Sequence, residues 1–250
     1  MNFEKVIANR DTKTVYQDNG RTIKLFIENY SKSDILNEAV NQARVEETSL
    51  IVPKLLEVTK IENRWALVSE HIEGTPLDKL MEENPEKEDE YLELFVKTQE
   101  EILKQRAPLL GRIHDKMRRK LNEATNIDDN TKYELLQRLE GIKTKNSVCH
   151  GDFNPSNVIV KENGEIFVID WAHVTQGNPS FDAARTYLLF SMEGKEKTAK
   201  KYLDLFAQKL EIDKKEIQRC VPIVAASQMS KGKEEEQEFL SKWIEVIDFQ

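Results

Sequence analysis

The sequence predicts an α+β fold in two lobes: a small β-sheet lobe with one main helix, residues 1–73, and a larger, mostly helical lobe, residues 74–250. Short runs of β-forming residues are concentrated in the first lobe, whereas segments with helical periodicity fill most of the second. At the boundary, Gly74 can bend freely, Thr75 can cap a helix and Pro76 suits a first helical turn.

The first lobe is predicted to have the order strand, strand, strand, helix, strand, strand. The stretch DNG at residues 18–20 is a strong signal for a tight hairpin turn. Ser31, with Asp34 three residues later, is typical of a helix start. The strands are expected at 3–8, 13–17, 21–28, 55–60 and 64–72, and the helix at 31–47.

The second lobe is predicted to consist of amphipathic helices, interrupted by one small hairpin at residues 157–170 with Asn163-Gly164 at its turn. The helices are expected at roughly 88–106, 109–124, 128–143, 182–192, 195–210, 213–230 and 233–247.

The composition is that of an ordinary globular protein, with 39% hydrophobic and 33% charged residues. A net charge of −8 argues against nucleic acid or an anionic membrane as the main partner. Two cysteines, no apolar leader in the first residues and no apolar run long enough to cross a bilayer predict a cytoplasmic protein. The oligomeric state is left open by the sequence.

The stretch CHGDFNPSN, residues 149–157, places His150, Asp152 and Asn157 directly before an apolar strand, and the hairpin that follows ends at Asp170. This layout suits phosphoryl transfer, which depends mostly on positioning and on neutralising charge. One carboxylate must orient the attacking hydroxyl group and accept its proton. An amide oxygen and a second carboxylate must hold Mg²⁺ against the phosphates, and the hairpin brings Asn157 and Asp170 together.

On these residues the chain resembles the aminoglycoside phosphotransferase and choline kinase family, whose members share a protein-kinase-like fold. The resemblance implies an ATP-dependent kinase, with GTP as the alternative donor, that phosphorylates a hydroxyl group of a small molecule. It also implies that Asp152 is the catalytic base and that Asn157 and Asp170 are the Mg²⁺ ligands. The family's His-Gly-Asp-x-x-x-x-Asn loop corresponds to His150, Gly151, Asp152 and Asn157, and its Ile-Asp pair to Ile169 and Asp170.

The first lobe carries the predicted phosphate contact. Lys24 lies on the strand after a hairpin, where kinases contact the α- and β-phosphates, and a helix glutamate pairs with that lysine. Glu38 is the predicted partner because it lies in the middle of the helix beside the apolar stripe. Glu46 and Glu47 on the same helix compete for this role.

Four other residues have expected roles. The stretch SEHIEG at 69–74 resembles the hinge between kinase lobes, where backbone groups of Glu70 and His71 would contact adenine. Asp182 resembles the family's buried aspartate that anchors the catalytic loop, with the N-cap of the next helix as the alternative. His150 is expected to brace the loop through hydrogen bonds.

Three features differ from protein kinases. The stretch IANRDTKTVY, residues 7–16, has no glycine, although protein kinases carry Gly-x-Gly-x-x-Gly there. The backbone amides that would cover the phosphates are therefore left open. Gly151 stands where the protein-kinase loop has arginine, and only eleven residues lie between Asp170 and Asp182. Gly151 and the short segment after Asp170 favour a small-molecule kinase over an atypical protein kinase. The presence of Lys24, Asp152, Asn157 and Asp170 favours it over a pseudokinase-type regulator that only binds nucleotide.

The acceptor is expected to be a small, hydroxyl-bearing and cationic molecule. The acidic balance of the chain and the segment EEEQEFLSKWIEVIDF near the C-terminus motivate this expectation, since carboxylates and aromatic faces both attract ammonium groups. The residues expected to contact the acceptor are Glu235, Glu238, Phe239, Trp243 and Glu245, with Trp171 and His173 as the opposite wall.

Overall fold

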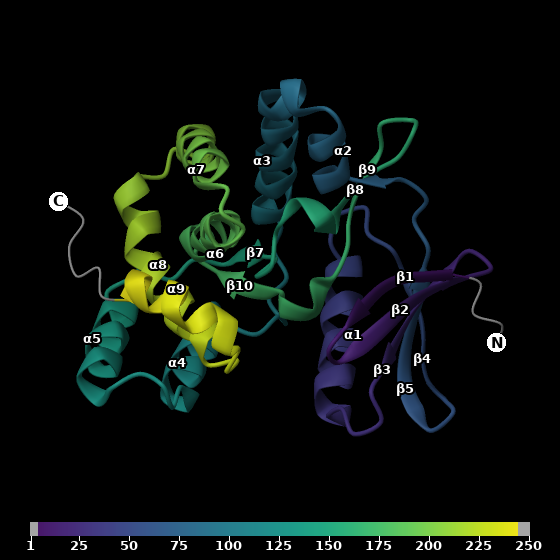
Figure 1. The fold of residues 1–250 in the computed structure, drawn as a ribbon, viewed down its shortest axis with the longest axis horizontal. Coiled ribbons are helices and arrows are strands. Elements are labelled where there is room, and N and C mark those ends of the chain that lie inside the picture. The colour runs from purple at the N-terminus through teal and green to yellow at the C-terminus, as the bar shows by residue number, and fades with distance from the viewer. Residues whose placement is uncertain (1–4, 245–250) are drawn as a thin grey trace. The chain divides into compact units, whose positions relative to one another are not determined.

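The computed structural model describes residues 5–244, and by packing the chain forms two compact units. The first unit comprises Met1–Glu86 and Pro155–His173, and the second comprises Lys87–Asn154 and Val174–Gln250. The predicted α+β fold, with an N-terminal antiparallel sheet and a mostly helical C-terminal part, is confirmed (Figure 1). The hairpin after the CHGDFNPSN stretch packs with the first unit, although it lies in the predicted second lobe. The boundary between the lobes at residues 73 and 74 was drawn along the sequence, and it stays a prediction.

The first unit contains a five-stranded antiparallel sheet of order β1-β2-β3-β5-β4. The turn between β2 and β3 and the turn between β4 and β5 both have the left-handed backbone typical of a two-residue hairpin: φ is 48° at Asn19 and 73° at Gly20, and 49° at Glu62 and 65° at Asn63. The predicted hairpin at 18–20 is therefore confirmed. The strands are β1 (Lys5–Arg10), β2 (Lys13–Asp18), β3 (Arg21–Phe26), β4 (Leu55–Ile61) and β5 (Arg64–Glu70).

Helix α1 (Lys32–Glu46) lies against one face of this sheet (Figure 1). Ser31 caps the helix as predicted, since its hydroxyl accepts a hydrogen bond from the Asp34 N–H at 3.4 Å. Phe26 and Leu67 meet apolar side chains of α1 on this face. The opposite face has its own buried cluster, formed by Ile23, Leu25, Ala66 and Val68.

A second, three-stranded sheet of order β6-β8-β9 completes the first unit. Thr75, predicted as a helix cap, instead pairs with Val160, and Pro76 precedes the helix. A Cβ atom on Gly74 would lie 2.7 Å from the carbonyl oxygen of Val160, so this close approach requires glycine. The elements are β6 (Thr75–Pro76), α2 (Leu77–Glu83), η1 (Pro85–Lys87), η2 (Pro155–Asn157), β8 (Val158–Val160), β9 (Ile166–Val168) and η3 (Trp171–His173).

The second unit is built mainly from helices, close to their predicted positions. The helix expected from residue 109 begins at Ile113, because the preceding residues form a turn held by Gln176, whose side chain donates to the carbonyls of Pro108 and Leu110. The helices are α3 (Glu88–Lys104), α4 (Ile113–Glu123), α5 (Asp129–Glu140), α6 (Pro179–Met192), α7 (Glu196–Leu210), α8 (Lys214–Met229) and α9 (Glu234–Ile244).

Two short strands, β7 (Ser147–Cys149) and β10 (Thr175–Gly177), pair antiparallel with each other. The first ends directly before His150, and the second begins after the hairpin that contains Asp170. Beside this pair, buried aromatic side chains form the core of the second unit, with Phe95 stacked on Phe153 at 4.3 Å between ring centroids. Within residues 5–244, none of the helices has the length and apolar character needed to span a bilayer.

Candidate functional site

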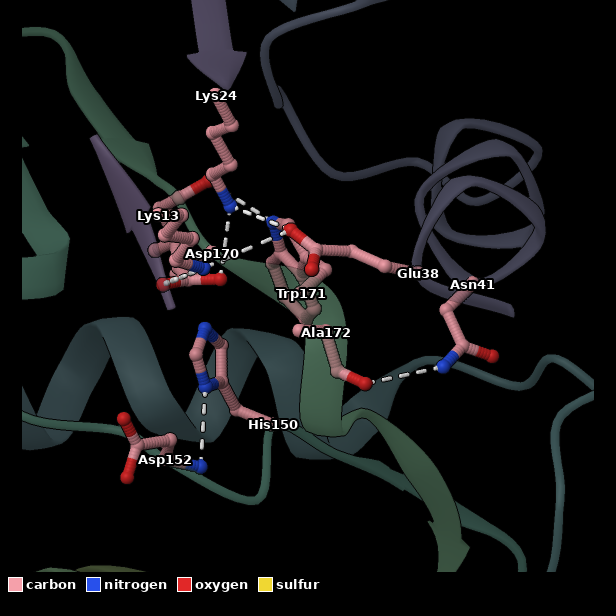
Figure 2. A network of polar contacts seen from close by, with 10 residues as sticks. Lys13, Lys24, Glu38, Asn41, His150, Asp152, Asp170, Trp171 and Ala172 are labelled. Carbon is pink, nitrogen blue, oxygen red and sulfur yellow. Dashed lines mark hydrogen bonds and ion pairs between the residues drawn. The ribbon is translucent and has the colours of Figure 1, made fainter. Parts of the chain in front are cut away.

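In the first unit, the predicted pair of Lys24 and Glu38 is present. Lys24 Nζ donates to Glu38 Oε1 at 2.7 Å, joining β3 to the middle of α1 (Figure 2). The competing Glu46 is engaged elsewhere, since its carboxylate accepts a hydrogen bond from the Leu55 N–H at 2.7 Å, and Glu47 is the C-cap residue of α1.

Lys24 also donates to Asp170 Oδ1 at 2.9 Å. The residue predicted to contact phosphate, Lys24, therefore binds the residue predicted to hold Mg²⁺, Asp170. Burial alone would lower the pKa of Lys24, but the carboxylates of Asp170 and Glu38 outweigh this and raise it above its ordinary value. For Asp170, burial acts to raise the pKa, but Lys24 and Lys13 outweigh it and hold the pKa well below its usual range. The three predicted residues therefore form one charged cluster.

The backbone holds Asp170 in an unusual conformation. Its φ of 63° lies in the left-handed region. For any residue other than glycine, this backbone conformation is unfavourable in free energy. The next residues are held within the first unit. Asn41 on α1 donates to the carbonyl of Ala172 at 3.2 Å (Figure 2). The Trp171 indole donates to the carbonyl of Val168 at 2.9 Å. These contacts stabilise the turn that presents the Asp170 carboxylate.

Asn157 lies on the same hairpin as Asp170. The Ile169 N–H donates to the carbonyl of Asn157 at 3.0 Å, so Asn157, just before β8, lies opposite the residue that precedes Asp170, just after β9. An amide and a carboxylate are the hard oxygen donors that suit Mg²⁺, which commonly takes one or two protein ligands together with substrate phosphates. Asn157 and Asp170 fit Mg²⁺ in that shared form. Within residues 5–244, no group of three or more His, Cys, Asp or Glu side chains is placed to hold a metal ion.

Lys13 is part of this cluster, although the sequence reasoning missed it. Its Nζ lies 3.7 Å from Asp170 Oδ2 and 3.9 Å from Glu38 Oε1. The signal was the register of the hairpin formed by β2 and β3. The turn at 18–20 pairs Lys13 with Phe26, which lies on the same face of β3 as Lys24.

Glu70 and His71 lie at the end of β5, and their backbone N–H groups are already bonded within the sheet. The Glu70 N–H donates to the carbonyl of Lys54 at 2.9 Å, and the His71 N–H donates to the carbonyl of Gly20 at 3.0 Å. His71 Nδ1 also lies 3.0 Å from the Thr22 hydroxyl. An adenine contact through either N–H would compete with these bonds, so the assignment of both residues stays a prediction.

In the second unit, the loop after β7 is built around two buried polar residues. Asp182 on α6 is 1% exposed and accepts from the Gly151 N–H at 2.7 Å and from Gln99 Nε2 at 3.0 Å. It therefore anchors the loop, whereas the N-cap of α6 is Asn178. Buried His150 accepts from the Asp152 N–H at Nδ1, which is the bracing role expected for it (Figure 2).

Asp152, the predicted base, forms an ion pair that the sequence did not indicate. Arg185 on α6, three residues after Asp182, donates from Nη2 to Asp152 Oδ1 at 3.0 Å. Asp152 also interacts electrostatically with Lys116 on α4. The Asp152 side chain keeps 28% of its surface exposed, so a ligand of the second unit can reach it.

The residues expected around a cationic acceptor have mixed surroundings. Trp171 is 1% exposed and cannot form a pocket wall, which corrects that expectation, because its indole is buried in the first unit. On α9, Phe239 contacts Trp243 at 6.0 Å between ring centroids, and both are half-buried. Glu238 pairs with Lys242 at 3.2 Å. Glu245 lies outside the described residues.

Comparison with known proteins yields a clear family match. The model of the phosphotransferase enzyme family matches residues 18–214, which include every site residue named from the sequence up to Asp182. No curated protein sequence matches the chain.

Solved structures resemble this fold over nearly its whole length. A thermostable mutant of aminoglycoside phosphotransferase APH(4)-Ia, in a ternary complex with ADP and hygromycin B, is 14% identical with a TM-score of 0.69, covering 96% of this chain and 90% of that one. A choline/ethanolamine kinase family protein from Mesorhizobium loti is 12% identical with a TM-score of 0.57, covering 99% and 84%. At such identities the likeness establishes the fold, in agreement with the predicted resemblance.

Proposed function

Because the chain belongs to the phosphotransferase enzyme family, we propose that it transfers the terminal phosphoryl group of ATP to a hydroxyl group of a small molecule. The observation that carries this proposal is the cluster of Lys24, Glu38 and Asp170, in which Lys24 contacts a carboxylate 146 positions away in sequence. Charged groups held at hydrogen-bonding distance in a partly buried place are typical of sites that bind phosphates and metal ions.

In this proposal each residue has one role. Lys24, oriented by Glu38, contacts phosphate oxygens of the nucleotide, and Asn157 with Asp170 holds Mg²⁺. Mg²⁺, when bound, neutralises charge on the phosphate oxygens. Asp152 orients the acceptor hydroxyl group and takes up its proton.

Two alternative functions compete with a small-molecule kinase. A pseudokinase-type regulator would bind nucleotide without turnover, but the chain retains Lys24, Asp152, Asn157 and Asp170, each of which catalysis needs. An atypical protein kinase would need a longer segment between Asp170 and Asp182 to dock a peptide. The small-molecule kinase is therefore the proposed function.

Calorimetry with a non-hydrolysable ATP analogue tests the nucleotide site. The wild type should bind the analogue with Mg²⁺, and Asp170→Ala should lose much more affinity for the Mg²⁺ complex than for the metal-free analogue, because a hard oxygen ligand is removed. Asp78→Ala on α2 is a matched control that should bind as the wild type does. Equal losses in both titrations would remove Asp170 from the metal site.

A turnover panel of hydroxyl compounds then separates the enzyme from a regulator. The panel should include aminoglycosides, choline and other alcohols, each assayed with ATP and with GTP. Phosphorylation of any member, lost in Asp152→Asn, supports the proposal, whereas nucleotide binding without turnover across the panel favours the regulator. The proposal includes two more specific predictions: the acceptor is cationic, and the protein is cytoplasmic.

A further inference from the structure

The first hairpin poses a chemical problem for a nucleotide site. In glycine-rich loops, backbone N–H groups approach the phosphates because no side chain intervenes. Residues 7–16 contain no glycine, and the described strands β1 and β2 pair as an ordinary antiparallel hairpin with one bulge. Some other positive or N–H group must then stabilise the phosphate charge that such a loop would cover.

Lys13, at the start of β2, lies where that charge is needed. Its ammonium group is within 4 Å of both carboxylates that Lys24 binds, namely Glu38 and Asp170. Figure 2 shows Lys13 and Lys24 approaching Asp170 from neighbouring strands. The ammonium group of Lys13 also lies over the ring of Phe26, with Nζ 5.9 Å from the ring centroid.

The distances indicate that the two lysines are held differently. Lys24 makes short hydrogen bonds of 2.7 and 2.9 Å, whereas Lys13 makes ion pairs of 3.7 and 3.9 Å, which are too long for hydrogen bonds. Lys13 can therefore leave its present partners at a smaller cost than Lys24. Its side chain is 17% exposed, and that of Asp170 is 32% exposed, so ligands can reach this end of the cluster.

Charge balance gives the reason for a second lysine. The cluster contains two ammonium groups and two carboxylates, so their formal charges cancel. If Asp170 turns its oxygens to Mg²⁺, both lysines lose a partner, and a partly buried ammonium group without an anion is costly. Phosphate oxygens arriving with the metal would replace the lost carboxylate contacts.

We propose that Lys13 is a second cationic ligand of the nucleotide phosphates and takes the place of the backbone amides of a glycine-rich loop. This inference rests on the proposed function, because it concerns the same nucleotide site. The Lys13 side chain would supply the positive charge that the backbone N–H groups of a glycine-rich loop would otherwise bring to the phosphates.

The test compares wild type, Lys13→Met and Lys13→Arg by calorimetry with Mg²⁺ and a non-hydrolysable ATP analogue. Met keeps the length and apolar stem of the side chain but removes the charge. A charged hydrogen bond is worth about 1.5 kcal/mol, so Lys13→Met should bind the analogue about tenfold more weakly. Lys13→Arg should retain most of the affinity. Lys60→Met, an exposed lysine on β4, is the matched control and should bind as the wild type does.

Two further readouts separate phosphate binding from a structural effect. Adenosine, which has no phosphate, should bind Lys13→Met and wild type equally. The affinity for the analogue should also fall less steeply with salt in Lys13→Met, because one charge contact is missing. Equal losses for adenosine and the analogue, or an unchanged salt dependence, would overturn the inference.

Failure of the inference is distinguishable from failure of the proposed function. If wild type does not bind the analogue with Mg²⁺, the proposed function fails. If wild type binds it and Lys13→Met binds it equally well, only the role of Lys13 is refuted.

Discussion

Asp152 is the residue whose chemistry can be tested most directly. Asp152→Asn preserves the size of the side chain but removes the proton acceptor, while the predicted metal ligands Asn157 and Asp170 are unchanged. Turnover should fall by about 10²–10⁴, and binding of Mg·ATP should persist. Steady-state rates with an accepted hydroxyl compound, together with calorimetry, measure both. Asp129→Asn on α5 controls for the loss of an aspartate, and wild-type turnover in Asp152→Asn would refute the assignment.

A second prediction for a single residue concerns Lys116 on α4. Burial, followed by repulsion from Lys231 and Arg185, lowers the pKa of Lys116 from 10.5 to about 8, while Asp152 and Asp182 act in the opposite direction. Between these two pKa values the unfolded chain binds more protons than the folded chain at this residue. The contribution of Lys116 to the free energy of unfolding should therefore rise with pH through that window.

Lys116→Met makes this prediction measurable. Met has no charge to bury, so the variant should gain stability relative to wild type at about pH 7, and this gain should shrink towards about pH 9.5. Urea denaturation at both pH values gives the difference in the free energy of unfolding. Lys120→Met, on the same helix, controls for the loss of a lysine from α4. A difference independent of pH would contradict the prediction.

Among the elements, β10 and α4 meet at a contact that only glycine allows. A Cβ atom on Gly177 would lie 2.8 Å from Ile113 Cβ and closer still to its Cγ2. Gly177→Ala should lower the free energy of unfolding by about 1–3 kcal/mol, because the strand or the helix must move to relieve the overlap. Urea denaturation checks this value. Gly111→Ala is the control, since an added Cβ there would meet no atom of the described chain within 4 Å. Equal stability of both variants would show that the contact adjusts freely.

For the whole molecule, the charge of the acceptor is the open question. The net charge of −8 favours a cationic acceptor, whereas Arg185 and Lys116 next to Asp152 favour an acidic one. A ligand at a hundred times its dissociation constant stabilises a protein by about 2.7 kcal/mol, which for a chain of this size raises Tm by about 5–10 °C. Thermal shifts of this size are easily measured.

The thermal-shift panel should compare aminoglycosides, choline and thiamine with neutral sugars, homoserine and gluconate, each with a non-hydrolysable ATP analogue present. The cationic prediction expects the shift with one of the first three compounds, and turnover should follow the same order. A shift and turnover with only neutral or acidic acceptors would refute it.

The sequence alone determined the order of the strands and the helix in the first sheet, the order of the long helices after it, and the motif residues. The short elements β6, β7 and β10 were not predicted. Helical and strand periodicity, the DNG turn and the Ser31 cap act over a few residues, so their signals can be read directly from the chain. The pairing of Lys24 with a helix glutamate followed from the kinase pattern, and the place of Glu38 in the middle of the helix selected it. Asp182 followed from the family resemblance.

Only the tertiary structure decided which distant side chains meet. Lys13 joined the cluster through the hairpin register, and Arg185 met Asp152 through the packing of α6 beside the loop. Thr75 formed a strand instead of a cap, and Trp171 became buried, because both are placed by contacts with the hairpin at 157–170. Local sequence patterns determine backbone conformation, whereas contacts across long stretches of chain depend on how whole elements pack, which no short stretch encodes.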